Sequence, residues 1–202
     1  MALEEQLIVE IRRKASGVQG IIISDFVYGV ITPRVLKVIK EQVARYNLLV
    51  FGDLQCSSQV GNVAKFKNFH LLCPTEREAR IAIDSQDKGL EKLANELMQQ
   101  TRTRNLIMKL GAEGLIAYET EKEEFISSQH FPALNPNPVD LVGAGDSLLA
   151  ALAVGLCSGV SLMQSSAIGS CMAALAVQRV GNVPVSRQRL KSYLNELTLY
   201  SN

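Results

Sequence analysis

Short apolar runs alternate along the chain with longer stretches that are apolar on one side only. Each short run is rich in Val, Ile, Leu or Phe and ends at a polar residue, a glycine or a proline. Runs of this length and composition are typical of buried strands. We therefore predict strands over residues 20–24, 48–51, 69–73 and 105–110.

The longer stretches predict helices that follow these strands. Thr32-Pro33 marks the start of one of them, because proline fits the first turn of a helix, where its missing N–H does no harm. Residues 115–119 and 124–128 instead alternate like a hairpin, and a proline-rich crossing follows at residues 131–138. We predict helices over residues 32–46, 76–83, 88–100, 147–157, 162–179 and 186–197.

Strands and helices in this alternation indicate an α/β fold with a mostly parallel sheet and covering helices. No linker or repeat divides the chain, so we predict one domain over residues 1–202. Such sheets hold their ligands outside the carboxyl ends of the strands. Asp25 and Asp53 follow two predicted strands, and we consider them either as a polar wall near a phosphate, a metal ion or a substrate, or as plain turn residues.

The charge balance excludes several partners. Among 202 residues, 21 Lys and Arg face 20 Asp and Glu, a formal net charge of +1 that offers no electrostatic attraction to nucleic acid or an anionic membrane. The first residues lack the pattern of a signal peptide, and the most apolar run, residues 148–160, is too short to span a bilayer. We expect a cytoplasmic protein with no nucleic-acid or membrane partner.

The cysteines and histidines show no metal-ligand spacing. No Cys-x-x-Cys pair occurs, so we expect reduced thiols rather than a zinc site or a disulfide framework. The residues concerned are Cys56, Cys73, Cys157, Cys171, His70 and His130.

The segment over residues 140–146, Asp-Leu-Val-Gly-Ala-Gly-Asp, directly precedes a long apolar helix. Gly143, Ala144 and Gly145 let a ligand approach the backbone, and unpaired N–H groups at a helix start attract an anion. Asp146 lies in the same first turn, where a carboxylate is placed to accept a proton from an attacking hydroxyl. An anion cradle beside a carboxylate suits phosphoryl transfer. A plain helix start explains the same residues, and the segment alone leaves both interpretations open.

The same segment resembles the C-terminal signature of the ribokinase-like, PfkB-type carbohydrate kinases. Other pieces follow the order of that family over about residues 18–195, including Leu110-Gly-Ala-Glu-Gly114, Pro74-Thr-Glu-Arg-Glu78, residues 173–181, and a Ser24-Asp25-Phe26 stretch similar to the heptose-phosphate kinase branch. The resemblance implies a ribokinase-like, Rossmann-like three-layer sandwich. It also implies transfer of the ATP γ-phosphoryl group, with Mg²⁺, to a hydroxyl of a sugar or sugar phosphate.

The resemblance also implies roles for individual residues. Asp146 would be the general base, and the amides of Gly143, Ala144 and Gly145 would form the anion hole. Glu78 would help to hold Mg²⁺, and Asp140 would contribute to a monovalent-cation site. The nucleotide-binding residues implied by position are Lys109, Gly111, Gly114, Thr75, Ser170 and Gly181.

Three positions depart from the family pattern: Thr75 and Ser170 replace asparagines, and Tyr28 replaces a lysine of the heptose branch.

The match begins at what would be the middle of the family fold, so we expect the N-terminal sugar-binding segment and lid strands to be missing. An exposed sheet edge would follow, and with it self-association. A non-catalytic or split nucleotide-binding module is the alternative function, and a vitamin-type acceptor is the alternative substrate.

Overall fold

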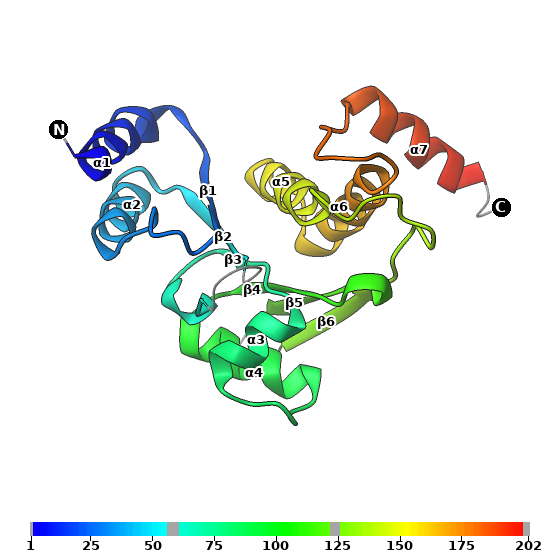
Figure 1. Cartoon of the computed structure of the whole chain (residues 1–202), viewed down its shortest axis with the longest axis horizontal. Helices are drawn as coiled ribbons and strands as arrows, with labels where there is room; N and C mark the ends of the chain where they lie inside the picture. Colours follow the sequence, from blue (N-terminus) through cyan, green and yellow to red (C-terminus); the bar gives the residue numbers. More distant parts are fainter. Residues whose placement is uncertain (1, 56–60, 122–125, 200–202) are drawn as a thin grey trace.

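The computed structural model describes residues 2–55, 61–121 and 126–199. A six-stranded sheet in the order β1-β2-β3-β4-β5-β6 forms its centre (Figure 1). The first four strands are parallel, and the last two pairings are antiparallel. The strands are β1 (Gly20–Asp25), β2 (Leu49–Leu54), β3 (Leu71–Leu72), β4 (Asn105–Lys109), β5 (Leu115–Thr120) and β6 (Ile126–Phe131).

Helices cover both faces of this sheet, which confirms the predicted three-layer α/β architecture. One core lies between the sheet and α1 to α4, and a second lies between the sheet and α5 and α6. Figure 1 shows α1 and α2 together on one side of the first strands, with α5 and α6 on the other side. The helices are α1 (Leu3–Lys14), α2 (Pro33–Tyr46), α3 (Glu76–Ile83), α4 (Leu90–Thr101), α5 (Ala144–Cys157), α6 (Leu162–Ala176) and α7 (Arg187–Leu199), with short 3-10 turns η1 (Ala15–Gly17), η2 (Val63–Lys65) and η3 (Gly111–Glu113).

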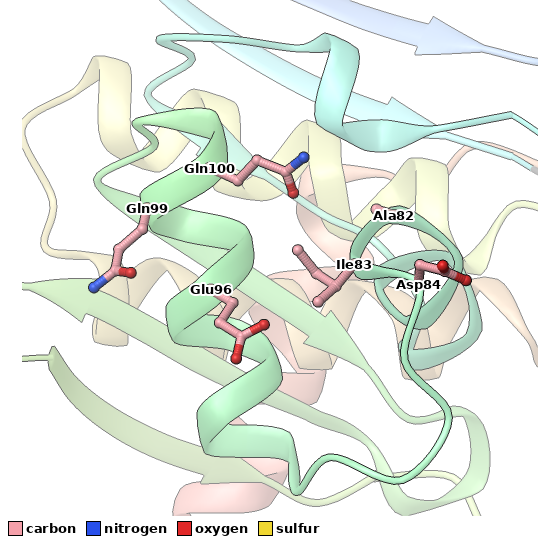
Figure 2. Close-up of a pocket in the computed structure, with 6 residues that line it drawn as sticks. All are labelled: Ala82, Ile83, Asp84, Glu96, Gln99 and Gln100. Atoms are coloured by element: carbon pink, nitrogen blue, oxygen red, sulfur yellow. The ribbon is translucent and has the colours of Figure 1, made fainter.

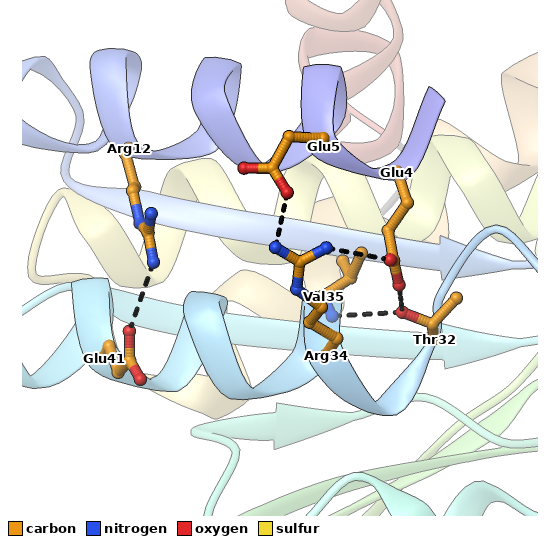
Figure 3. Close-up of polar contacts among 7 residues, drawn as sticks. All are labelled: Glu4, Glu5, Arg12, Thr32, Arg34, Val35 and Glu41. Carbon is orange, nitrogen blue, oxygen red and sulfur yellow. Dashed lines mark hydrogen bonds and ion pairs between the residues drawn. The ribbon is translucent and has the colours of Figure 1, made fainter. Parts of the chain in front are cut away.

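The first helix, α1, is absent from the sequence-based prediction. It buries Ile8 against the core and joins α2 through polar contacts (Figure 3). Arg34 on α2 pairs with Glu4 at 3.2 Å and also with Glu5. The acidic first turn and the basic last turn of α1 complement its dipole, a signal that identifies this helix in retrospect.

Several predicted boundaries shift in the structure. The strand predicted over residues 69–73 pairs only at Leu71–Leu72, whereas β2 continues through Asp53 rather than ending before it. The long apolar helix begins at Ala144, three residues earlier than predicted. Cys56 and residues 122–125, which include the start of the strand predicted over residues 124–128, lie outside the described residues. Cys73, Cys157 and Cys171 are free thiols. No helix in the described ranges is long and apolar enough to cross a membrane.

The direction of α5 fixes where its N-terminus lies. A Cβ on Gly20, at the start of β1, would lie 2.9 Å from Cys157 Sγ at the end of α5. A Cβ on Gly145, at the start of α5, would lie 3.6 Å from Lys109 Nζ at the end of β4. The helix therefore runs opposite to the parallel strands, and its N-terminus lies at their carboxyl ends.

β1 is an edge strand in the part of the sheet that is described. Ile22 at its centre is 46% exposed, more than is usual for a central position on a strand. Self-association through this edge stays a prediction, and sedimentation analysis of the purified chain measures it directly.

Candidate active site at the start of helix α5

The start of α5 is a glycine-containing turn in which one of the three amides expected to be open is already used. Gly143 precedes the helix in the left-handed region, at φ 81° and ψ −1°. Ala144 N–H donates to Leu141 O at 3.3 Å, so the expectation that its amide is unpaired is wrong. The amides of Gly143 and Gly145 donate to no acceptor within the described ranges. Asp146 follows in the first helical turn and is half-buried.

A buried ion pair lies directly beneath this helix start. Lys109 Nζ donates to Asp53 Oδ1 at 2.8 Å and to Asp53 Oδ2 at 3.0 Å. The Asp53 side chain is fully buried and that of Lys109 is 17% exposed. Burial acts to lower the pKa of Lys109, but the charge and hydrogen bonds of Asp53 outweigh it, so the pKa lies above its ordinary value. A Cβ on Gly145 would press toward both partners, at 3.6 Å from Nζ and 3.9 Å from Oδ2.

Thr75 and Glu78 lie next to this pair. Thr75 forms an isolated bridge with Lys109, whose N–H donates to Pro74 O at 2.8 Å. Thr75 also caps α3: Glu78 N–H donates to Thr75 Oγ1 at 3.2 Å, and Thr75 N–H donates to Glu78 Oε2 at 2.8 Å. This capping box fixes the Glu78 carboxylate, which is buried, at the carboxyl end of β3.

Asp140 braces the loop that leads into the helix. Its Oδ2 accepts the N–H of Gly181 at 2.7 Å, and its Oδ1 accepts the N–H of Val142 at 3.0 Å. These bonds, from Gly181 first and Val142 second, hold the pKa of Asp140 below its usual range. Asn182 packs against the same loop at Gly143. A Cβ on Gly143 would lie 2.3 Å from Asn182 Oδ1, so a larger residue does not fit there. Asn182 is absent from the residues predicted for the site, and its one signal in the sequence is its place beside Gly181.

Gly111 and Gly114 close the turn after β4. Leu110 N–H donates to Gly114 O at 2.8 Å, and Gly114 N–H donates to Gly111 O at 3.1 Å. Both glycines have positive φ, at 63° and 93°. A Cβ on Gly114 would lie 2.1 Å from Phe131 O, whereas one on Gly111 would meet nothing within 4 Å. The close packing of the turn against the end of β6 therefore requires glycine at position 114. At position 111 there is room for a side chain.

Asp25 lies on the other face of the sheet. It follows Ile23, which belongs to the core under α1 to α4, by two residues, whereas Asp53 follows Phe51 in the core under α5 and α6. Side chains two residues apart on a strand share a face. Asp25 is buried and pairs with Lys65. Of the two aspartates considered at strand ends, the structure thus brings only Asp53 to the α5 start.

Ser170 lies on α6 with its hydroxyl buried and without a hydrogen-bond partner in the described part of the chain. No hydrogen bond or ion pair among the described residues joins Ser170 to the start of α5.

An open groove lies elsewhere, between α3 and α4 (Figure 2). It has a volume of about 620 Å³ and contains none of the predicted site residues. Asp84 and Glu96 bring two carboxylates to it, and Lys88 pairs with Glu96. No Lys or Arg belongs to its lining, so it offers little positive charge to a phosphorylated ligand.

Solved structures with the same arrangement define the class of fold. The ribokinase of Giardia lamblia matches with a TM-score of 0.78 at 18% identity, over 96% of this chain and 64% of that one. Phosphofructokinase-2 from Escherichia coli in complex with potassium matches with a TM-score of 0.77 at 17% identity, over 96% and 62%. The fold is therefore ribokinase-like, as the sequence resemblance implied.

A family model described as pfkB family carbohydrate kinase matches residues 18–188, and the chain belongs to this family. Among curated relatives, the bifunctional protein HldE of Trichlorobacter lovleyi is 29% identical over 187 residues, which are 91% of this chain and 36% of the relative. HldE of Campylobacter jejuni subsp. doylei is 28% identical over 95% of this chain and 40% of its own length. The chain thus spans less than half the length of these relatives.

Proposed function

We propose that this chain carries the phosphoryl-transfer centre of an ATP-dependent carbohydrate kinase. The observation that supports the proposal is the start of α5 at the carboxyl ends of the parallel strands. There the left-handed Gly143 and the carboxylate of Asp146 flank the amide of Gly145, which has no acceptor among the described residues. Backbone donors and a helix dipole at one point stabilise a phosphoryl group as its charge redistributes.

Asp146 acts as the general base. It takes the proton of the acceptor hydroxyl while that oxygen forms a bond to the γ-phosphorus of ATP, and the bond from the γ-phosphorus to the β-γ bridging oxygen breaks to release ADP. The amides of Gly143 and Gly145 donate to the phosphoryl oxygens during this transfer. Gly181 and Ser170 belong to the nucleotide side of the site, and the turn of Gly111 and Gly114 shapes the backbone there.

The donor set suits Mg²⁺. Glu78 offers a carboxylate that Thr75 holds in place, and Mg²⁺ is held in kinases by one or two carboxylates, water and the substrate's phosphates rather than by a protein cage. When bound, the ion neutralises charge on the β- and γ-phosphates. Asp140 uses both carboxylate oxygens on backbone N–H groups, so its contribution to a monovalent-cation site would come through its backbone carbonyl or a shared oxygen.

The acceptor is a sugar or a sugar phosphate. Support comes from solved neighbours, since ribokinase from Arabidopsis thaliana is described as complexed with ribose and ATP, and phosphofructokinase-2 from Escherichia coli as complexed with fructose-6-phosphate. A vitamin-type alcohol is the alternative acceptor, and a nucleotide-binding module that needs a partner chain is the alternative function.

The test is calorimetric titration of MgATP combined with ADP measurement in the presence of ribose, fructose 6-phosphate or a heptose phosphate. Asp146→Asn is expected to keep MgATP affinity and to lose turnover by about 10²- to 10⁴-fold, as removal of a general base does. Asp87→Asn, an exposed aspartate in the loop before α4, is the matched control for the change of charge. Binding with no acceptor-dependent ADP would support the module instead, and retained turnover in Asp146→Asn would refute the assigned base.

A further inference from the structure

Two aspartate–lysine pairs lie at the carboxyl ends of the parallel strands, one on each face of the sheet. Asp53–Lys109 lies under the start of α5, and Asp25–Lys65 lies on the face covered by α1 to α4. Both aspartates are buried, with side-chain exposures of 0% and 4%. The two pairs have the same charged groups, but only Asp53–Lys109 lies beside the N-terminus of α5.

The surroundings of Asp53–Lys109 point to an anionic ligand. The Lys109 ammonium lies at the N-terminal end of α5, where the helix dipole favours anions and disfavours cations. Burial of an ion pair is also a weak source of stability, because desolvation offsets the attraction. Gly145 leaves the space above the pair free of a side chain. The Lys109 ammonium is therefore more favourable at this place when a phosphate is bound beside it than when no ligand is bound.

We propose that Asp53 is a positioning residue that holds the Lys109 ammonium beneath Gly145, where the ammonium donates a hydrogen bond to a phosphate oxygen of the nucleotide. An ammonium has three donor hydrogens, and the two contacts to one carboxylate, at 2.8 and 3.0 Å, leave donor capacity for a ligand. Asp53 itself touches no substrate and acts through Lys109. This inference rests on the proposed function and adds to it the origin of the charge under the anion cradle.

The first measurement compares the affinities of MgATP and adenosine in the same proteins by calorimetry. Lys109→Met removes the ammonium and keeps an unbranched side chain of similar length. It is expected to weaken MgATP binding by about 10- to 100-fold, the range for a hydrogen bond to a charged group, while adenosine affinity stays within about two-fold. A purely structural loss would reduce both affinities together.

The second measurement asks whether Asp53 acts through Lys109. Asp53→Asn alone is expected to weaken MgATP binding, because the ammonium is no longer held in place. In the Lys109→Met background the same substitution is expected to change MgATP affinity by less than about two-fold. The double variant is also expected to unfold at a higher temperature than Lys109→Met, since it removes the buried carboxylate that the single variant leaves unpaired.

The matched control is the pair on the opposite face of the sheet. Asp25→Asn combined with Lys65→Met removes the same two charges from the same end of the sheet. This variant is expected to keep the wild-type ratio of MgATP to adenosine affinity.

Two results would overturn the inference while leaving the proposed function intact. One is a double variant, Asp53→Asn with Lys109→Met, that folds and binds MgATP as tightly as the wild type. The other is an equal loss of MgATP and adenosine affinity in Lys109→Met. A wild-type chain that binds neither compound would refute both the proposed function and the inference.

Discussion

Gly114 offers a sharp test of how the turn after β4 is built. Its φ of 93° and ψ of −125° lie in a region that L-residues rarely enter, and a Cβ there would lie 2.1 Å from Phe131 O and 2.6 Å from Ala133 N. The backbone conformation costs about 1–3 kcal/mol for alanine. Overlap with fixed backbone atoms adds about 1–3 kcal/mol. We therefore expect Gly114→Ala to lower the free energy of unfolding by about 2–6 kcal/mol.

Gly111→Ala is the matched control in the same turn. Gly111 has a φ of 63°, and a Cβ there would meet nothing within 4 Å, so only the left-handed backbone is penalised, by about 1 kcal/mol. For a chain of this size each kcal/mol moves the melting temperature by about 2–4 °C. Thermal unfolding followed by circular dichroism should show a loss of about 4–24 °C for Gly114→Ala and about 2–4 °C for Gly111→Ala. Equal losses in the two variants would refute the packing argument.

Two further predictions concern residues near the site. Thr75→Ala should lower the free energy of unfolding by about 1 kcal/mol in urea titrations, because the Thr75 hydroxyl caps α3; Thr75→Asn, which keeps a capping oxygen, should lose clearly less. The pKa of Asp140 is lowered by the N–H groups of Gly181 and Val142, so its contribution to stability is complete above the unfolded-state pKa and disappears as the pH falls through the folded one. Stability curves measured below pH ~5 should therefore fall less steeply for Asp140→Asn than for the wild type, and parallel curves would contradict this role.

The sheet could be predicted because each parallel strand is a short apolar run. β2, β3 and β4 are largely buried, whereas the edge strand β1 leaves Ile22 46% exposed. Most covering helices carry a broad apolar stripe or a clear start signal such as Thr32-Pro33. The helix α1 could not be found this way, because Ile8 is its only fully buried residue among those described. Ile8 packs with the half-buried Leu7 and Ile11 on the core, and the polar contacts to α2 form only after the chain has folded.

The candidate site could be predicted as a segment but not as an arrangement. The Gly-Ala-Gly-Asp sequence predicts a helix start, and α5 begins there, at Ala144. The pairing of Asp53 with Lys109 joins strands 56 residues apart in the sequence, and no local pattern identifies such partners. The bond of Ala144 to Leu141 likewise depends on the turn that the loop adopts, so only the structure shows that this amide is used.

The most direct test of the central claim is detection of the product itself. Phosphorus NMR of the purified chain with MgATP and each acceptor sugar should show a new sugar-phosphate resonance growing as ADP appears. The same spectra of Asp146→Asn should show intact ATP over the same period. A wild-type chain that binds MgATP yet forms no phosphorylated product with any acceptor, or an Asp146→Asn chain that forms it at the wild-type rate, would contradict a phosphoryl-transfer centre at the start of α5.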